Sequence, residues 1–202
     1  MKQSVFQKTS KQNTVYIWYA VFLLCICACR SKHPQVIIET SSGTIIAEIY
    51  ADQAPVTAGN FLKLIDENKY DEGAVFYRVT RDDNQPDNEF KIDVIQGGLR
   101  KVGETDPIPH ETTRETGLRH LNGSLSMARS APGTAGSEFF ICIGDQPELD
   151  FGGRRNPDGA GFAVFGRVIQ GMDVVRIIQQ QRDRDQYLIE PVLIHTIRRS
   201  GK

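Results

Sequence analysis

The stretch LNGSLSMARS (residues 121–130), APGTAGS (131–137) and EFFICIG (138–144) decides the fold of this chain. Two apolar runs with the composition of β-strands flank a segment of small residues, glycines and one proline. This pattern predicts two strands joined by a turn-rich loop. Small residues beside Met127, Phe139 and Phe140 leave room next to large apolar side chains, which suits a shallow pocket. On composition alone, a plain core hairpin is the simpler interpretation.

The order of residues in this stretch resembles the signature of the cyclophilin-type peptidyl-prolyl isomerases. That signature runs Gly, one residue, Leu or Ile, Ser-Met-Ala, a small-residue loop and Ser-Gln-Phe-Phe-Ile. Residues 123–128 and 137–141 match it, with Glu138 where many members have Gln. The resemblance extends from about Val36 to Arg198. It implies a mainly β fold, a closed eight-stranded antiparallel β-barrel capped by two α-helices, in a domain that spans residues 36–199.

Length and charge restrict the classes of function. With 202 residues, the chain can bury one good core, so a single domain is expected. Lys and Arg number 24 against 25 Asp and Glu, which leaves no basic field to attract nucleic acid. We therefore expect no nucleic-acid partner, and a monomer is the default oligomeric state.

Residues 1–28 differ in character from the rest of the chain. Lys2, Lys8 and Lys11 give a positive start without an acidic residue, and an almost unbroken apolar run follows over residues 15–28. This run is too short to span a hydrocarbon core of ~30 Å. The layout is that of a secretory signal peptide. A membrane anchor that stays uncleaved is the alternative interpretation.

Residues 26–29, Ile-Cys-Ala-Cys, resemble a bacterial lipobox, in which a small residue precedes the cysteine that is lipidated after cleavage. The resemblance makes Cys29 the lipidated mature N-terminus and residues 29–35 a tether. It implies an exported, periplasmic protein that is held to the membrane by lipid. Arg30 follows in place of the aspartate that retains lipoproteins in the inner membrane, which favours the outer membrane.

Periodicity and turn residues predict the remaining elements. Strands are expected at residues 36–40, 44–49, 74–79, 91–98, 161–168 and 192–198, in addition to the two of the opening stretch. Helices are expected at residues 54–68, with Pro55 in the first turn, and at 172–178. Residues 99–119 are predicted to be irregular.

The strand at 74–79 carries the first candidate site residue. Alternation places Phe76 and Arg78 on one face, and from the residues alone an exposed arginine on a half-solvated sheet is the favoured interpretation. The resemblance implies instead that Arg78 is the family's catalytic arginine, since residues 76–79 match Phe-His-Arg-Val except at Tyr77. It likewise implies that Gln96 binds the substrate backbone and that Phe140 lies in the proline pocket. The other expected substrate contacts are Phe76, Met127, Ala128, Arg129, Glu138, Leu149 and Phe162.

Two positions depart from the family pattern. Asp93 stands where a pocket phenylalanine is usual, and Glu148 stands where an aromatic residue is usual. These departures support a second hypothesis, in which the domain is a membrane-tethered chaperone module that binds proline peptides without catalysis. A smaller apolar wall should weaken binding by up to a few kcal/mol.

The mechanism that the resemblance implies acts on X–Pro peptide bonds of exported polypeptides. Uncatalysed isomerisation is slow because rotation breaks amide resonance. A donor aimed at the proline nitrogen binds the twisted bond better than either planar form, which is what catalysis requires. Arg78 is the hypothesis for this donor. No nucleophile, proton transfer, metal or cofactor is needed.

Other residues that could carry chemistry are weaker candidates. His110 and Glu111 have no second ligand at helical spacing, so structural hydrogen bonding is preferred over metal binding or acid–base chemistry. Cys142 lies in an apolar strand and is expected to be a small buried hydrophobe. A serine hydrolase is a third hypothesis, but the chain has no Gly-x-Ser-x-Gly elbow, and the residue spacing assigns no Ser-His-Asp set.

Overall fold

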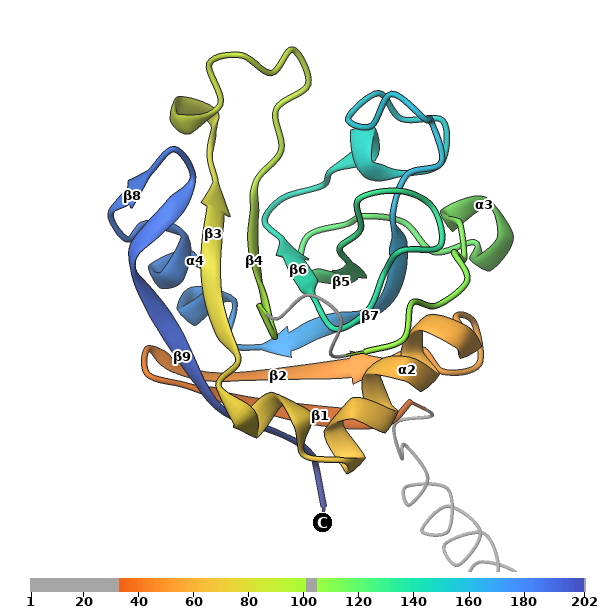
Figure 1. The fold of residues 1–202 in the computed structure, drawn as a ribbon, viewed down its shortest axis with the longest axis vertical. Helices are drawn as coiled ribbons and strands as arrows, with labels where there is room; N and C mark the ends of the chain where they lie inside the picture. Colours follow the sequence, from red (N-terminus) through yellow and green to blue (C-terminus); the bar gives the residue numbers. More distant parts are fainter. Residues whose placement is uncertain (1–32, 101–104, 202) are drawn as a thin grey trace, which may run out of the picture. The chain divides into compact units, whose positions relative to one another are not determined.

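The computed structural model describes residues 33–100 and 105–201. Eight strands close into an antiparallel barrel in the order β1-β2-β7-β5-β6-β4-β3-β9, and β9 pairs back with β1 (Figure 1). The bounds are β1 Gln35–Thr40, β2 Gly43–Ile49, β3 Val75–Thr80, β4 Val94–Gly98, β5 Ser124–Met127, β6 Phe139–Cys142, β7 Ala163–Gln170 and β9 Tyr187–Arg199. The predicted eight-stranded barrel is confirmed, and closure removes the unpaired edges that these strands would otherwise expose.

Both predicted helices are present, and the described residues also contain one short helix that was not predicted. α2 (Pro55–Asp66) packs on β7 and β9, and α4 (Met172–Gln179) packs on β2, β3 and β4. α3 (Thr113–Thr116) lies in the segment that was expected to be irregular. Thr112 and Glu115 form a reciprocal capping box there, and Gly117 ends the helix in a left-handed conformation. The Thr-x-x-Glu pattern could therefore have predicted α3. The described residues also form three single-turn 3-10 helices: η1 Lys69–Glu72, η2 Asp82–Asn84 and η3 Pro147–Leu149.

The last strand is longer than expected and begins with a tight hairpin. β8 (Asp183–Arg184) pairs only with the start of β9, at Leu188 and Tyr187. Asp185 and Gln186 form the turn with φ values of 52° and 73°, which is the left-handed geometry that two-residue hairpins require. This hairpin brings the side chain of Gln186 beside β3.

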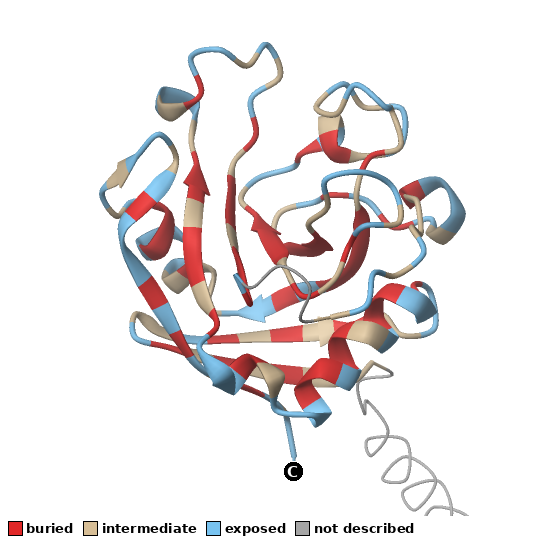
Figure 2. Cartoon of the chain, in the orientation of Figure 1, coloured by how far each residue is buried: buried red, intermediate tan, exposed pale blue. Residues whose placement is uncertain are grey.

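The barrel interior is built around large aromatic side chains. Phe61 of α2 lies 4.9 Å from Phe165, 5.4 Å from Phe139 and 5.5 Å from Tyr70, measured between ring centroids. All four residues are fully buried, and the buried positions in Figure 2 lie mainly along the strands and on one side of α2. Among the described residues, no helix is long and apolar enough to cross a membrane.

Glu111 and His110 have structural partners. The Glu111 carboxylate accepts hydrogen bonds from the backbone N–H groups of Val56 and Thr57, at 3.1 and 2.6 Å, and so caps the N-terminus of α2. Nε2 of His110 lies 3.2 Å from the carbonyl oxygen of Ala160. The prediction of structural hydrogen bonding at this pair is confirmed.

Candidate active site

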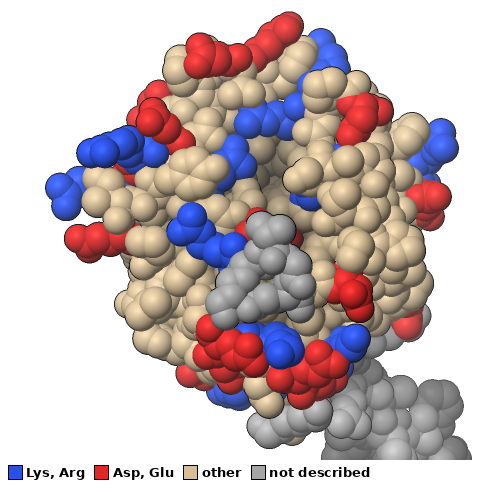
Figure 3. Space-filling view, viewed as in Figure 1, with Lys and Arg blue, Asp and Glu red and all other residues tan. Residues whose placement is uncertain are grey.

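The candidate site lies on the outer face of the barrel wall formed by β4 and β6. Alternate residues of β6 point to opposite sides: Phe139 and Ile141 belong to the barrel core, whereas Phe140 and Cys142 belong to a second, smaller apolar cluster. This division matches the predicted alternation. A pocket of about 590 Å³ opens beside the smaller cluster. Figure 3 shows the hollow in this face, with basic side chains around it.

A β-bulge in β3 turns Arg78 toward this pocket. Phe76 pairs with Gly97 and Arg78 pairs with Gln96, so Tyr77 is an extra residue without a partner on β4. The predicted placement of Phe76 and Arg78 on one face is therefore wrong. Phe76 points into the barrel core, and Arg78 lines the pocket.

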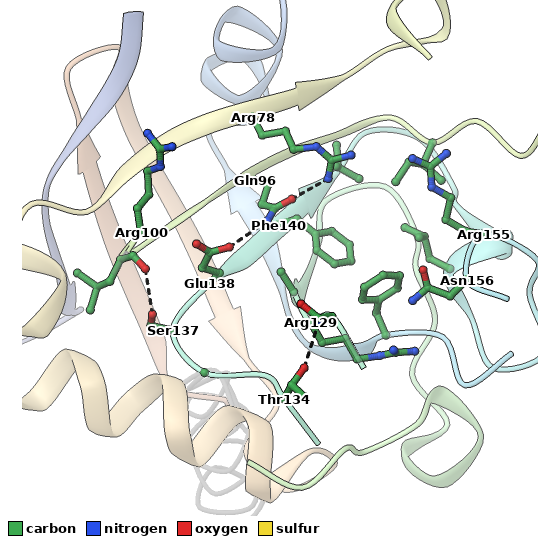
Figure 4. Close-up of a pocket in the computed structure, with 18 of the residues that line it drawn as sticks. Arg78, Gln96, Arg100, Arg129, Thr134, Ser137, Glu138, Phe140, Arg155 and Asn156 are labelled. Atoms are coloured by element: carbon green, nitrogen blue, oxygen red, sulfur yellow. Dashed lines mark hydrogen bonds between the residues drawn. The ribbon is translucent and has the colours of Figure 1, made fainter. Parts of the chain in front are cut away.

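Within the described part of the chain, only neutral amides hold Arg78. Its Nη1 donates to Oε1 of Gln96 at 2.9 Å (Figure 4). Its Nε and Nη2 donate to Oε1 of Gln186 at 3.1 and 2.5 Å. Neither partner neutralises the guanidinium charge. Gln186 was not predicted, because it reaches Arg78 from a hairpin more than a hundred residues further along the chain.

Glu138 is held on the far side of Gln96. The Tyr77 hydroxyl donates to Oε2 of Glu138 at 2.5 Å, and Nε2 of Gln96 donates to the Tyr77 oxygen and to Glu138 at 2.8 and 3.1 Å. Burial and the hydrogen bond to Glu138 raise the pKa of Tyr77, so the phenol stays protonated. Gln96 therefore bridges a carboxylate and a guanidinium and is fixed at both ends of its amide.

The apolar wall of the pocket consists of side chains from four segments. The rings of Phe140 and Phe162 meet edge to face at 5.3 Å between centroids. Leu149, which is fully buried, packs with them in the smaller cluster, together with Ile92 and Val94. Ile92 and Val94 were not predicted, although alternation back from Gln96 places both on its face.

Ala128 and Arg129 also line the pocket, directly after β5. The Arg129 guanidinium forms a two-bond ion pair with Asp158, at 2.7 and 3.0 Å, and donates to the carbonyl oxygen of Gly161. It also lies over the Phe162 ring at 5.1 Å. The side chain of Arg129 therefore fixes the loop that carries Phe162.

Comparison with known proteins shows the family of this chain. The family described as cyclophilin type peptidyl-prolyl cis-trans isomerase/CLD matches residues 35–199. This chain belongs to the cyclophilin family. A peptidyl-prolyl cis-trans isomerase of Streptomyces antibioticus is 34% identical over 175 residues, which cover 81% of this chain and 97% of that protein. Peptidyl-prolyl cis-trans isomerase B of Escherichia coli is 35% identical over 143 residues, covering 69% of this chain and 80% of that protein.

Solved structures show the same fold. The crystal structure of a Cryptosporidium parvum cyclophilin type peptidyl-prolyl cis-trans isomerase superposes with a TM-score of 0.66 at 24% sequence identity, covering 84% of this chain and 99% of that one. A second crystal structure of that protein, determined in the presence of the dipeptide Ala-Pro, has a TM-score of 0.65. Both comparisons support the cyclophilin barrel.

Two expected substrate contacts of this cyclophilin do not reach the pocket. Phe76 and Met127 are 0% and 1% exposed, and both pack inside the barrel. For Phe76 the cause is the bulge at Tyr77, and Met127 shares its face of β5 with the core residue Leu125. The structure brings the other eight predicted residues to the pocket: Arg78, Gln96, Ala128, Arg129, Glu138, Phe140, Leu149 and Phe162.

The two acidic departures from the family pattern lie outside the pocket lining. Asp93 accepts a hydrogen bond from Nε2 of Gln179 at 3.3 Å, and Ile92 and Val94 on either side of it face the pocket instead. Glu148 forms an ion pair with Arg154 at 2.9 Å. Neither carboxylate interrupts the apolar wall.

A buried Ser-His-Asp chain lies behind Phe140, although spacing in the sequence did not reveal it. Nδ1 of His120 lies 2.7 Å from Asp150, and its Nε2 lies 2.9 Å from Oγ of Ser126. Ser126 is 0% exposed, so no substrate reaches its hydroxyl. The imidazole stacks on Phe140 with 5.9 Å between ring centroids. The hydrogen-bonded Ser126, His120 and Asp150 therefore support the pocket floor and do not form a hydrolase site.

The remaining candidates for chemistry have structural roles. Cys142 is fully buried, and burial raises the pKa of its thiol, as expected of a small hydrophobe. Within residues 33–100 and 105–201, no group of three His, Cys, Asp or Glu side chains is arranged to hold a metal ion. The predicted signal peptide, lipidation site and most of the tether lie outside the described residues.

Proposed function

We propose that this cyclophilin catalyses cis–trans isomerisation of X–Pro peptide bonds in polypeptides, with Arg78 as the catalytic donor. The observation that carries the proposal is the placement of an uncompensated guanidinium at the edge of an apolar slot. Gln96 and Gln186 orient Arg78, and Phe140 lies at the floor of the slot. The relatives that carry the name peptidyl-prolyl cis-trans isomerase support the reaction class.

The arrangement favours the twisted peptide bond over both planar forms. Rotation by about 90° removes amide resonance, and the proline nitrogen regains a lone pair that can accept a hydrogen bond. Arginine carries five N–H donors, and the bonds to Gln96 and Gln186 use three of them. Two donors therefore remain for the substrate. One charge-assisted hydrogen bond is worth about 1.5–3 kcal/mol, or about 10- to 150-fold in rate.

The apolar slot would hold the proline ring while the bond turns. A continuous apolar surface lines the slot, against which a pyrrolidine ring can pack. It is formed by Ile92, Val94, Phe140, Leu149 and Phe162. The crystal structure of the Cryptosporidium protein with Ala-Pro is consistent with a proline ligand for this fold. No covalent step takes part, and the protein contributes orientation and electrostatic stabilisation.

The test compares the protein with its Arg78→Ala and Arg78→Lys variants on an X–Pro test peptide. We expect kcat/KM to fall at least about tenfold in Arg78→Ala. Arg78→Lys should give an intermediate value, because lysine keeps the charge but lacks the planar fork. Isomerisation by Arg78→Ala at the wild-type rate would refute the role of Arg78.

The same assay separates catalysis from binding alone. Asp93 and Glu148 suggested a non-catalytic peptide binder, but neither side chain lines the pocket. A wild-type protein that binds proline peptides without turning them over would establish that function in place of the isomerase.

The location of the activity rests on the sequence. We propose that residues 1–28 direct export, that Cys29 is acylated, and that the isomerase acts as a monomer on exported proteins in the periplasm, tethered to the outer membrane. The charged start, the short apolar run and the lipobox-like residues 26–29 support this. Cells grown with labelled palmitate should label the protein, and Cys29→Ser should abolish the label. Equal labelling of both would exclude Cys29 as the lipidation site.

A further inference from the structure

Three arginines face the pocket without a carboxylate partner among the described residues. Arg78 is held by amides, and Arg100 lies over the Tyr77 ring at 4.8 Å. Arg155 donates to the carbonyl oxygen of Phe90 at 2.7 Å. All three arginines line the pocket, which leaves more positive than negative charge among the described residues of its walls.

The excess of charge is concentrated at one end. Glu138, the carboxylate on the pocket wall, lies on the same side as Arg100 in Figure 4, where Tyr77 and Gln96 bind it. Arg155 and Asn156 lie at the opposite end, beyond Arg78 and Phe140. The end formed by Arg155 therefore carries a positive charge that no acidic side chain of the described lining residues balances.

Arg154 and Arg155 are adjacent in the sequence but lie in different surroundings. Arg154 is exposed, forms an ion pair with Glu148 at 2.9 Å and stacks on the Phe90 ring at 4.0 Å. Arg155 is partly buried and turns into the pocket. Arg154, whose charge is paired, faces solvent, whereas Arg155 faces the pocket.

The charges of Arg155 and Arg78 act on each other. Burial lowers the pKa of Arg155, and the positive charge of Arg78 lowers it further. Two guanidinium groups close enough to repel each other gain from an anion between or beside them. Arginine is also the side chain best suited to bind a carboxylate, through two parallel hydrogen bonds.

We propose that Arg155 binds an acidic side chain of the substrate, so that this cyclophilin prefers X–Pro segments with Asp or Glu next to the proline. The inference rests on the proposed isomerase function and adds a substrate class to it. Ile92, Leu149 and Phe162, which form the proline slot, line the same pocket as Arg155. A proline in the slot therefore places its neighbouring residue within reach of the guanidinium.

The test uses test peptides that carry Glu, Gln or Lys at each position adjoining the proline. We expect kcat/KM for Glu to exceed that for Gln by about tenfold at one of these positions, with Lys below Gln. The preference should shrink when the salt concentration rises from 0.05 to about 1 M, because exposed charges are screened.

Arg155→Gln and Arg154→Gln form a matched pair of variants. In Arg155→Gln, the ratio of kcat/KM for Glu over Gln peptides should fall to within twofold of one. In Arg154→Gln, whose arginine faces away from the pocket, the ratio should stay near its wild-type value.

The outcomes distinguish this inference from the function on which it rests. Turnover at the same rate for Glu, Gln and Lys peptides would overturn the inference and leave the isomerase intact. A preference for Glu that persists in Arg155→Gln would overturn the assignment to Arg155. No turnover of any peptide would remove the proposed function and the inference with it.

Discussion

Removing the side chain of Gln186 tests whether the orientation of Arg78 limits catalysis. Oε1 of Gln186 accepts two of the three hydrogen bonds that hold the Arg78 guanidinium, at 3.1 and 2.5 Å, and Gln96 accepts the third. Without Gln186 the guanidinium turns about its bond to Gln96 and spends less time facing the proline nitrogen. We expect a loss of about 1–2 kcal/mol in transition-state stabilisation, which lowers kcat/KM about 5- to 30-fold.

Glycine is the appropriate replacement at this position. Gln186 has a φ of 73°, and glycine adopts this conformation without the strain that a β-carbon brings. The backbone of the turn should therefore keep its shape when the amide is lost. Asp185→Gly is the matched control, because Asp185 has a φ of 52° in the same turn and an exposed side chain.

The assay measures kcat/KM on one X–Pro peptide for the wild type and both variants, together with the melting temperature of each. Gln186→Gly should lose activity and Asp185→Gly should retain it. If Gln186→Gly stays within twofold of the wild type, the orientation of Arg78 by Gln186 is irrelevant to catalysis. Equal losses of kcat/KM in both variants would show that the backbone of the turn, and not the Gln186 side chain, affects activity.

Two further predictions concern stability. Burial lowers the pKa of His120, although its bond to Asp150 opposes this, so the unfolded state binds the proton first and the unfolding free energy falls as pH drops below about 6.5. Urea unfolding at pH 7.5 and 5.5 should show a smaller fall in unfolding free energy for His120→Asn than for the wild type, and equal falls would contradict this. Gly98→Ala should lower the unfolding free energy by at least about 2 kcal/mol, because the φ of Gly98 is 133° and the new β-carbon would lie 2.6 Å from the Ser137 carbonyl oxygen. A melting temperature equal to that of the wild type would contradict this.

The sequence predicts the site where regular alternation holds. Phe139 and Phe140 lie on the faces that alternation assigns, because β6 has no bulge and pairs evenly with β4 and β5. In β3 the same rule fails at Tyr77, where one extra residue reverses the faces of Phe76 and Arg78. No residue type in this segment marks a bulge, since Tyr and Arg are ordinary strand residues.

Residues that act from hairpins and loops were the hardest to predict. Gln186 follows a two-residue strand and sits in a left-handed turn that lacks glycine and asparagine, so the usual turn signal is missing. Arg155 and Arg154 are adjacent in the sequence and chemically identical. Their separation into the pocket and the surface depends on Glu148 and Phe90, which only the folded chain brings together.

The amide of Gln96 explains how a carboxylate and the guanidinium proposed as the catalytic donor share one pocket. A carboxylate in direct contact with Arg78 would pair with its charge and occupy the donors that the proline nitrogen needs. Gln96 lies between the two groups, accepts from Arg78 through its oxygen, and donates through its nitrogen to Glu138 and Tyr77. Arg78 is thereby oriented without being neutralised. The described residues also place no carboxylate against Arg155, which leaves its charge unbalanced beside Arg78. One arrangement would therefore serve both the proposed catalysis and the proposed preference for acidic substrates.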